Sequence, residues 1–319
     1  MGTKFYGHLV NLENSITYSE TNWDQLIPPG CVVMMDHSTS IFTKSLLKVL
    51  NNKNIPVGML MHGLDPTSNL LHDENSVELP GIGAFSYLSE NSSLFVVNNS
   101  VYAEKCLRFG VAPDKMRILG SPRFSKKWSM TLSNLLPNSD IKKYGNGQFK
   151  VCIMLSKWMY NNWEEETHRV IRTLLRIDGV FLFIKPHTRG MKFENKSSEN
   201  CFVDNENTYN SRSIIEWSNL VLFSISSIFL DALLLDKPVL HLKLTTSNKM
   251  ACQHIMKSWN VDCRDDLIHW VEKLKKDEFC RTYTKKEAED CLDYYVKDRD
   301  GKMLERYCSE ILEIGKNGK

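Results

Sequence analysis

The chain is 319 residues long, which is enough for two compact domains with a core in each. Apolar residues make up 42% and charged residues 24%, a mixture typical of a folded globular protein rather than a disordered one. The 40 Lys and Arg nearly balance the 38 Asp and Glu, giving a net charge of +2, so this is not the basic chain expected of a nucleic-acid-binding protein.

The N-terminal segment and the cysteines bear on the compartment. Residues 1–10 hold no apolar run of signal-peptide length, and nowhere do about 18 apolar residues follow one another. The nine cysteines include no Cys-x-x-Cys pair, which argues against a zinc ribbon or a disulfide framework. We therefore expect a cytoplasmic protein, which could also work at the inner face of the membrane.

In the first half of the chain, short apolar strands alternate with helices. Strands are predicted at 31–35, 55–61, 94–97 and 116–119, with helices at 41–50 and 100–109. Strands that alternate with helices in this way pair in parallel and form a sheet covered on both faces. This half is predicted to be a Rossmann-like domain over residues 1–130.

The same pattern restarts after residues 131–147, whose polar and turn residues indicate an interdomain linker. Strands are predicted at 150–155, 180–184, 220–223 and 238–242, with helices at 163–176, 213–217 and 226–235. The charged tail, 263–314, shows no strand pattern and is predicted to form helices packed on the outside. The fold class is therefore α/β, with a second Rossmann-like domain over 148–319.

Ligands of open parallel sheets bind at the carboxyl ends of the strands, so the residues there are the candidates for a site. Lys185, His187 and Arg189 follow one strand and could neutralise the phosphates of a nucleotide without a metal ion. Lys and Arg are also common on ordinary solvated loops, and that alternative stays open. We expect no metal site and no bound cofactor.

Three serines and an aspartate follow the strand at 220–223. Ser226 and Ser227, with Ser224 before them, precede a helix whose first amides would suit a phosphate. A simple helix cap is the competing interpretation, because Ser is common at that position. Asp231 lies one turn further on and could face a ribose or pair with a neighbouring cation.

His62 is the candidate general base, because histidine titrates near neutral pH and Gly63 beside it lets a ligand approach the backbone. A lone histidine more often makes a structural hydrogen bond. Asp36, His37 and Asp65 follow neighbouring strands and could orient it. No Walker loop or glycine-rich dinucleotide fingerprint is present, since Gly81 and Gly83 are not followed by the required helix pattern.

The order of these motifs over residues 55–243 resembles a known family. The stretch from Phe95 to Arg123, which ends in Gly-Ser-Pro-Arg, resembles the end of the first domain of GT-B glycosyltransferases and their relatives. The segments 184–187 and 226–238 resemble the second domain of CDP-glycerol glycerophosphotransferases and of bacterial polysialyl- and Kdo-type capsule transferases. The resemblance implies two sheets facing across a cleft, with the donor nucleotide held by His187, Ser226 and Ser227 and the reacting centre faced by His62.

Two departures from the family pattern concern the donor and the base. Ser224 stands where the glycerophosphotransferases usually have an acidic residue, and the loop from His62 to Pro66 is one residue longer than theirs. The sequence thus predicts transfer of a sugar or polyol phosphate from a CMP, CDP or UDP donor to a surface glycan or lipid-linked acceptor. The alternatives are a nucleotide-sugar epimerase and a non-catalytic nucleotide-binding scaffold in capsule assembly.

A lipid-linked acceptor would bring the protein to a membrane, and one helix offers a candidate surface for peripheral contact. Lys273, Lys275 and Lys276 lie on it with Trp270 and Leu274. An ordinary solvated helix face is the competing interpretation.

Overall fold

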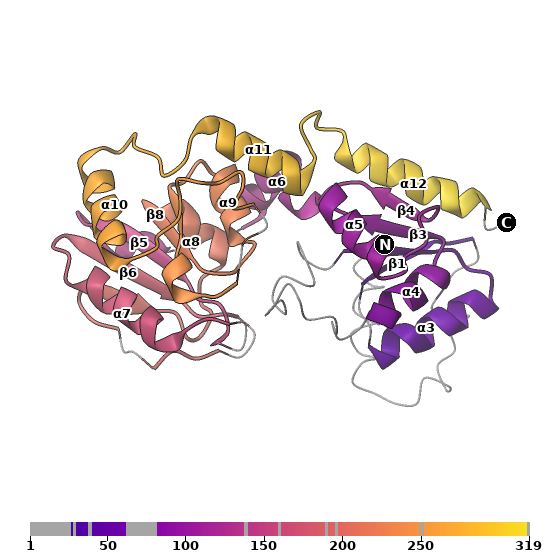
Figure 1. Ribbon diagram of the computed structural model, residues 1–319, viewed down its shortest axis with the longest axis horizontal. Coiled ribbons are helices and arrows are strands. Elements are labelled where there is room, and N and C mark those ends of the chain that lie inside the picture. The colour runs from indigo at the N-terminus through magenta and orange to yellow at the C-terminus, as the bar shows by residue number, and fades with distance from the viewer. Residues whose placement is uncertain are drawn as a thin grey trace. The chain divides into compact units, whose positions relative to one another are not determined.

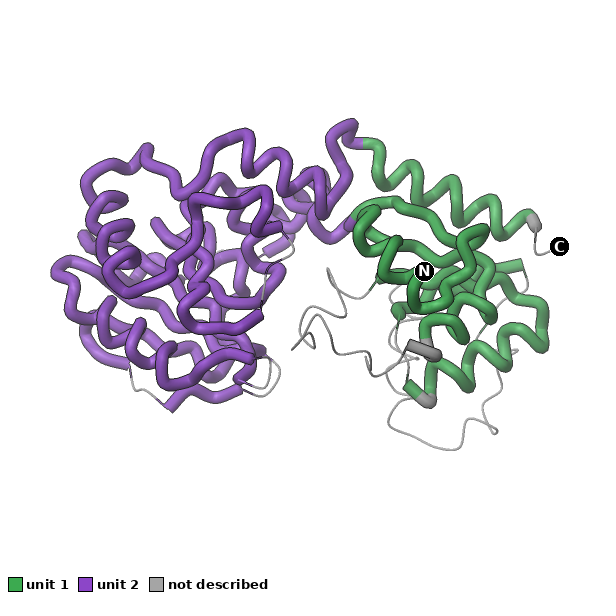
Figure 2. Tube along the Cα trace, viewed as in Figure 1, with its two compact units in different colours: residues 1–62, 78–120, 302–319 green, residues 63–77, 121–301 purple. Residues whose placement is uncertain are grey.

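The computed structural model describes residues 27, 30–37, 40–61, 82–136, 140–158, 161–188, 191–194, 197–248, 250 and 252–317. The chain forms two compact units (Figure 2). Unit 1 comprises residues 1–62, 78–120 and 302–319, and unit 2 comprises 63–77 and 121–301. Each unit is built around one parallel sheet with helices, which confirms the predicted α/β class.

The sheet of unit 1 has four parallel strands in the order β1-β2-β3-β4 (Figure 1). They are β1 (Val33–Asp36), β2 (Val57–Leu60), β3 (Leu94–Val97) and β4 (Met116–Ile118). The register places Asp36 opposite Leu60, so the first two strands end together. The connections run through α3 (Ile41–Asn52), α4 (Ile82–Glu90) and α5 (Ser100–Arg108), as parallel pairing requires.

These three helices share one core with the sheet. Leu47 and Leu50 of α3, Leu88 of α4 and Cys106 of α5 are fully buried with Phe95 of β3. The last helix, α12 (Met303–Asn317), also belongs to this unit. Its Tyr307 hydroxyl donates to the Gly120 carbonyl at 2.8 Å.

The sheet of unit 2 has five parallel strands in the order β7-β6-β5-β8-β9 (Figure 1). They are β5 (Phe149–Met154), β6 (Val180–Lys185), β7 (Cys201–Val203), β8 (Leu220–Phe223) and β9 (Val239–His241). The strands β6 and β8 are buried along their whole length. Unbroken apolar runs of this kind belong to a parallel sheet covered on both faces.

Helices pack against both faces of this second sheet. On one face lie α7 (Glu164–Leu175) and α10 (Arg264–Lys276), whose apolar side chains share a core with β5, β6, β8 and β9. On the other lie α8 (Ser211–Trp217) and α9 (Ile228–Leu234), where Trp217 meets Phe183 at 5.6 Å between ring centroids and Phe229 meets Phe223 at 5.4 Å. The described part of unit 2 also contains the helices α6 (Lys126–Leu135) and α11 (Lys285–Val296).

The structure divides the chain differently from the predicted domains of 1–130 and 148–319. The first boundary falls at residue 120, and residues 302–319 return to unit 1. The predicted linker, 131–147, contains the end of α6 and a 3-10 helix (Asp140–Lys143) that packs on unit 2, with Ile141 buried and the Tyr144 carbonyl accepting from Trp217 Nε1 at 3.3 Å. The turn residues of this segment led us to predict a linker, but Ile141 and Tyr144 pack into unit 2.

The sequence showed no helix pattern of the kind that the dinucleotide fingerprint requires after Gly81 and Gly83, but the structure has a helix there, since α4 spans Ile82–Glu90. The third glycine of the dinucleotide fingerprint is still missing, since Ser86 occupies its position.

Candidate functional site

The loops that follow the strands of unit 2 leave from the same edge of its sheet, because all five strands are parallel. Pro186 and His187 follow β6, Ser224 to Ser227 follow β8, and a 3-10 helix (Lys243–Thr245) comes soon after β9. The predicted donor-site residues of this unit therefore start from one edge, with the exception of Arg189, which lies outside the described residues.

Lys185 is a structural residue rather than the phosphate ligand that we expected. Its ammonium donates to the Asp204 carboxylate at 2.6 Å, to the Tyr209 carbonyl at 2.7 Å and to Asn207 Oδ1. The Lys185 and Asp204 side chains are only 3% and 0% exposed. A lysine has three donor hydrogens, and these partners use all three. Lys185 thus fastens the end of β6 to residues 204–209 from inside the unit.

His187 remains as the described basic candidate of this loop. It is half-buried and follows the buried Pro186. Its carbonyl accepts from the Met191 amide at 3.3 Å, which closes the loop behind it. The anchored Lys185 two residues earlier holds the backbone from which the imidazole extends.

Ser224 is likewise tied into the unit. Its hydroxyl lies 2.7 Å from the Thr245 hydroxyl, and that hydroxyl donates to the Leu242 carbonyl at 2.8 Å. Because a threonine hydroxyl has one hydrogen, Ser224 must be the donor of the first bond. Ser224 therefore joins the loop after β8 to the loop after β9, and it supports the site instead of offering its hydrogen to a ligand.

Ser226 and Ser227 behave differently from each other. The Ser226 hydroxyl accepts from the Ile228 amide at 3.3 Å, so it caps the start of α9, and among the described residues no acceptor takes its own hydrogen. Ser227 is the N-cap residue by backbone position but makes no side-chain cap bond. Within the described residues no hydrogen bond to its half-exposed hydroxyl is found. The helix begins at Ile228 rather than at the predicted residue 226.

Asp231 lies near two cations, which favours the second of its two interpretations. Burial raises the pKa of its carboxyl, and the positive charges of Arg123 and Arg212 lower it. Arg212 is itself buried and bonded to Ser129 and Ser133 of α6. The carboxylate thus faces side chains of its own unit, and a ribose contact is not needed to explain it.

In unit 1, Asp36 ends β1 with an exposed side chain, whereas His37 next to it is buried. The His37 ring stacks on Phe95 at 4.1 Å between centroids, and neither of its nitrogens has a hydrogen-bond partner among the described residues. Burial lowers the pKa of His37 to about 3. The ring is therefore neutral at pH 7 and part of the core. His62 and Asp65 lie outside the described residues.

The buried His37 predicts a loss of stability in acid. Its pKa is lower in the folded protein, about 3, than the ordinary 6.5, so the unfolded chain binds the extra proton as the pH falls between these values. The linkage amounts to about 2 kcal/mol of unfolding free energy at about pH 5. His37→Leu should remove that part of the acid sensitivity, measured by urea unfolding at neutral and acidic pH. Burial also lowers the pKa of His241, to about 4, so the variant should keep a smaller acid dependence.

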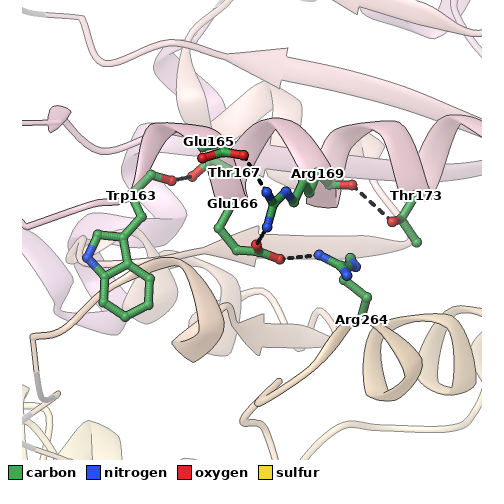
Figure 3. A network of polar contacts seen from close by, with 7 residues as sticks. All are labelled: Trp163, Glu165, Glu166, Thr167, Arg169, Thr173 and Arg264. Atoms are coloured by element: carbon green, nitrogen blue, oxygen red, sulfur yellow. Dashed lines mark hydrogen bonds and ion pairs between the residues drawn. The ribbon is translucent and has the colours of Figure 1, made fainter.

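The glutamates in the first turn of α7 are paired with arginine side chains. Arg169 bonds to Glu165 and to Glu166, and Arg264 of α10 donates to Glu166 at 2.6 Å (Figure 3). These glutamates suit the positive end of the helix dipole, and they leave it unsuited to a phosphate. The network instead fixes α7 to α10 on the outer face of the sheet.

The apolar part of the helix face that we considered for membrane contact is wholly or partly buried, whereas Lys273 and Lys276 are exposed. Leu274 of α10 is 4% exposed, and Trp270 packs against the core with Lys273 over its ring at 4.8 Å. Lys275 donates to the Asp178 carbonyl at 2.7 Å. The lysines therefore cover and brace the unit, which favours the solvated-face interpretation.

No group of three or more His, Cys, Asp or Glu within the described residues is placed to hold a metal ion. Nor does any helix among them combine the length and the apolar character required to span a bilayer.

Thr245 and Asp204 were not singled out from the sequence, although they support the site. They lie 21 residues from Ser224 and 19 residues from Lys185, and only the folded sheet brings each pair together. No local pattern in the sequence marks such partners.

No protein-family model matches the chain, and no curated protein does. Solved structures are similar to it. The S. aureus MnaA–UDP co-structure aligns with a TM-score of 0.58 at 15% identity, over 88% of this chain and 74% of that chain. The UDP-GlcNAc 2-epimerase from Methanocaldococcus jannaschii aligns with a TM-score of 0.52 at 17% identity, over 82% and 75%.

A third similar structure is the wall teichoic acid polymerase TagF soaked with CDPG. It aligns with a TM-score of 0.51 at 14% identity, over 83% of this chain and 69% of that chain. At such identities the likeness establishes the fold, and it confirms the GT-B fold that the sequence resemblance implied.

Proposed function

We propose that this chain, which has the GT-B fold, is an enzyme that uses a nucleotide-activated donor. It transfers a sugar or a polyol phosphate from a CMP, CDP or UDP donor to a hydroxyl of a surface glycan or a lipid-linked precursor. The observation that carries the proposal is the gathering of His187, Ser226 and Ser227 at one edge of the unit 2 sheet, where ligands of open parallel sheets bind.

The proposed roles rest on the chemistry of each group and on its place after a strand of unit 2. His187 is the basic side chain that binds a donor phosphate, with Arg189 as its neighbour in sequence. Ser226 would donate its hydrogen while it caps α9, and Ser227 would offer its hydroxyl beside it. Together they would stabilise the phosphate that departs, without a metal ion. Lys185 and Ser224 hold the two loops in place from behind.

In unit 1, His62 is the proposed general base that removes the proton of the acceptor hydroxyl. It follows Met61, which comes directly after β2, and Asp36 ends the neighbouring β1 in register with Leu60. The carboxylates of Asp36 and of Asp65 would orient the imidazole.

A nucleotide thermal-shift panel tests the proposal. A ligand at about 100 times its Kd stabilises the folded state by about 2.7 kcal/mol, so CMP, CDP or UDP should raise the Tm while purine nucleotides should not. His187→Ala should weaken that nucleotide by about 10- to 100-fold, because a hydrogen bond to a charged group contributes about 1.5–3 kcal/mol. His269→Ala, on the exposed side of α10, is the matched control.

If no pyrimidine nucleotide stabilises the protein, the proposal is wrong. Binding without turnover on any acceptor would point to the scaffold alternative.

An epimerase is the second candidate, because UDP-GlcNAc 2-epimerases are among the similar structures. The two reactions differ in whether they need an acceptor. An epimerase converts its nucleotide sugar with no acceptor present and keeps the nucleotide attached, whereas the proposed transferase releases the nucleotide only when an acceptor hydroxyl is supplied. Following free nucleotide with and without a glycan acceptor distinguishes them.

A further inference from the structure

The strand order of unit 2 places a topological switch point between β5 and β8. From β5 the chain passes through α7 to β6 on one side, and from β8 it passes through α9 to β9 on the other. The two helices lie on opposite faces of the sheet, so the loops that lead into them diverge at the ends of β5 and β8. Ligands of open parallel sheets bind at such a point. The described residues of the loop after β5 are therefore candidates for the site.

Hydrogen bonds join the loop after β5 to the loop that holds the serines. The Ser156 hydroxyl donates to the Ile225 carbonyl at 2.6 Å, one residue before the proposed phosphate ligands. At the other end of the loop, the Trp163 amide donates to the Thr245 carbonyl at 2.8 Å. The hydroxyl of this same threonine is the one that Ser224 bonds at 2.7 Å. The backbone of Trp163 is thus tied to the loop that carries the serines.

The backbone of Trp163 is held on both sides, whereas its ring is not. Its carbonyl accepts from the Thr167 hydroxyl at 2.9 Å, which fixes the start of α7. The indole extends away from the helix and from the network of glutamates and arginines beside it (Figure 3). Trp163 is 51% exposed, and within the described part of the chain its indole has no stacking, cation or hydrogen-bond partner. A large flat ring is therefore offered to a ligand from a fixed backbone.

The chemistry of this position favours a flat and uncharged ligand group. Nucleobases stack on aromatic side chains, and tryptophan loses little conformational freedom on binding because it has only two side-chain torsions. The glutamates that follow Trp163 make the adjoining helix end unsuited to a phosphate. A single exposed apolar side chain is ordinary on a protein surface. The position of Trp163 at the switch point, tied to the serine loop, is what distinguishes it.

We propose that the indole of Trp163 stacks on the nucleobase of the donor nucleotide. The inference rests on the proposed function, because it assumes that a nucleotide binds at this edge of the sheet with its phosphates at His187, Ser226 and Ser227. It adds to that site a residue whose contribution to affinity does not depend on charge. Stacking tolerates every base, so Trp163 supplies affinity, and other groups select the pyrimidine.

The test measures the affinity of the full chain for the nucleotide that gives the largest thermal shift. Trp163→Ala should weaken that nucleotide by about 5- to 150-fold, the equivalent of about 1–3 kcal/mol for the loss of one base–aromatic stack. Trp163→Phe should retain most of the affinity, because phenylalanine still offers a ring. Saturating nucleotide should also change the tryptophan fluorescence of the parent, and Trp163→Phe should lose most of that change while it still binds.

Trp128→Ala is the matched control, since Trp128 is 41% exposed but lies on α6 and not on a loop at a strand end. The control should bind nucleotide as the parent does. Circular dichroism should show that all three variants remain folded, as expected for substitutions of exposed side chains.

Two results would overturn the assignment and leave the proposed function standing, provided that His187→Ala still loses affinity. One is unchanged nucleotide affinity in Trp163→Ala, and the other is a fluorescence change that persists in Trp163→Phe. If Trp163→Ala keeps its nucleotide affinity but raises the KM for the acceptor, the ring belongs to the acceptor site instead. Absence of nucleotide binding by the parent would refute both the assignment and the proposed function.

Discussion

Lys185→Met should lower the free energy of unfolding by about 3–5 kcal/mol, the cost of leaving a buried charge without its partner. The Lys185 ammonium meets the Asp204 carboxylate at 2.6 Å where both side chains are almost fully buried. Asp204 would keep the amides of Thr208 and Tyr209, at 2.7 and 3.1 Å, but would lose the countercharge. Methionine fills a similar volume, so the loss reports the charge and not a cavity.

Urea unfolding followed by tryptophan fluorescence measures this effect, read at the midpoint of the transition of unit 2 because two units need not unfold together. Lys192→Met is the matched control, since Lys192 pairs with Glu206 at 3.8 Å with both side chains about 80% exposed. An exposed pair contributes about 0–1 kcal/mol. Equal effects of the two substitutions would refute the structural role of Lys185.

The same variant separates the structural role from the role first predicted. If Lys185 only fastens the loop, folded Lys185→Met at low temperature should bind nucleotide within a few-fold of the parent, whereas His187→Ala should not. Strong loss of nucleotide affinity in a well-folded Lys185→Met protein would restore Lys185 to the phosphate site.

His62→Ala should lower turnover by about 10²- to 10⁴-fold while nucleotide affinity is retained, as expected for loss of a general base. Two histidines follow neighbouring strand ends in unit 1. Burial lowers the pKa of His37 to about 3, and its ring is packed on Phe95, so it is a poor base for an acceptor hydroxyl at neutral pH. His62 is therefore the candidate that remains.

Steady-state kinetics with a defined donor and acceptor provides the measurement, with the nucleotide thermal shift as the binding readout. In the parent, kcat/KM should fall as the pH drops below the pKa of the base, and His62→Ala should lack that limb. His37→Leu is the informative companion, because it should change stability in acid but leave turnover at neutral pH nearly unchanged. Normal turnover of His62→Ala would remove His62 from the reaction.

The central strands of each sheet were predictable from the sequence, whereas the short edge strand β7 was not. Runs such as Leu94–Val97 and Leu220–Phe223 are apolar throughout, and the structure begins and ends these strands at the predicted residues. By contrast β7, Cys201–Val203, is a three-residue edge strand, which is too short to show a period. Helix α4 was missed because glycine and serine interrupt its apolar pattern.

For the candidate site, the position of each residue near a strand end was predictable from the sequence, but the role of its side chain was not. That Lys185, Ser224 and Ser226 would follow strands was visible from the order of residues. Whether each points to a ligand depends on partners such as Asp204 and Thr245, which are distant in sequence. A lysine at a strand end carries the same local signal in either case, and only its neighbours in the fold assign its role.

The return of α12 to unit 1 bears on how the protein folds during synthesis. Domains usually fold in the order in which they leave the ribosome. Here residues 302–319 are made after all of unit 2, yet they belong to unit 1, where the Tyr307 hydroxyl donates to the Gly120 carbonyl. Unit 2 can therefore complete its folding first. Until α12 has been synthesised, the sheet of unit 1 lacks one of its helices. We therefore expect chaperones that bind nascent chains to stay bound longer to the N-terminal part of unit 1 than to unit 2.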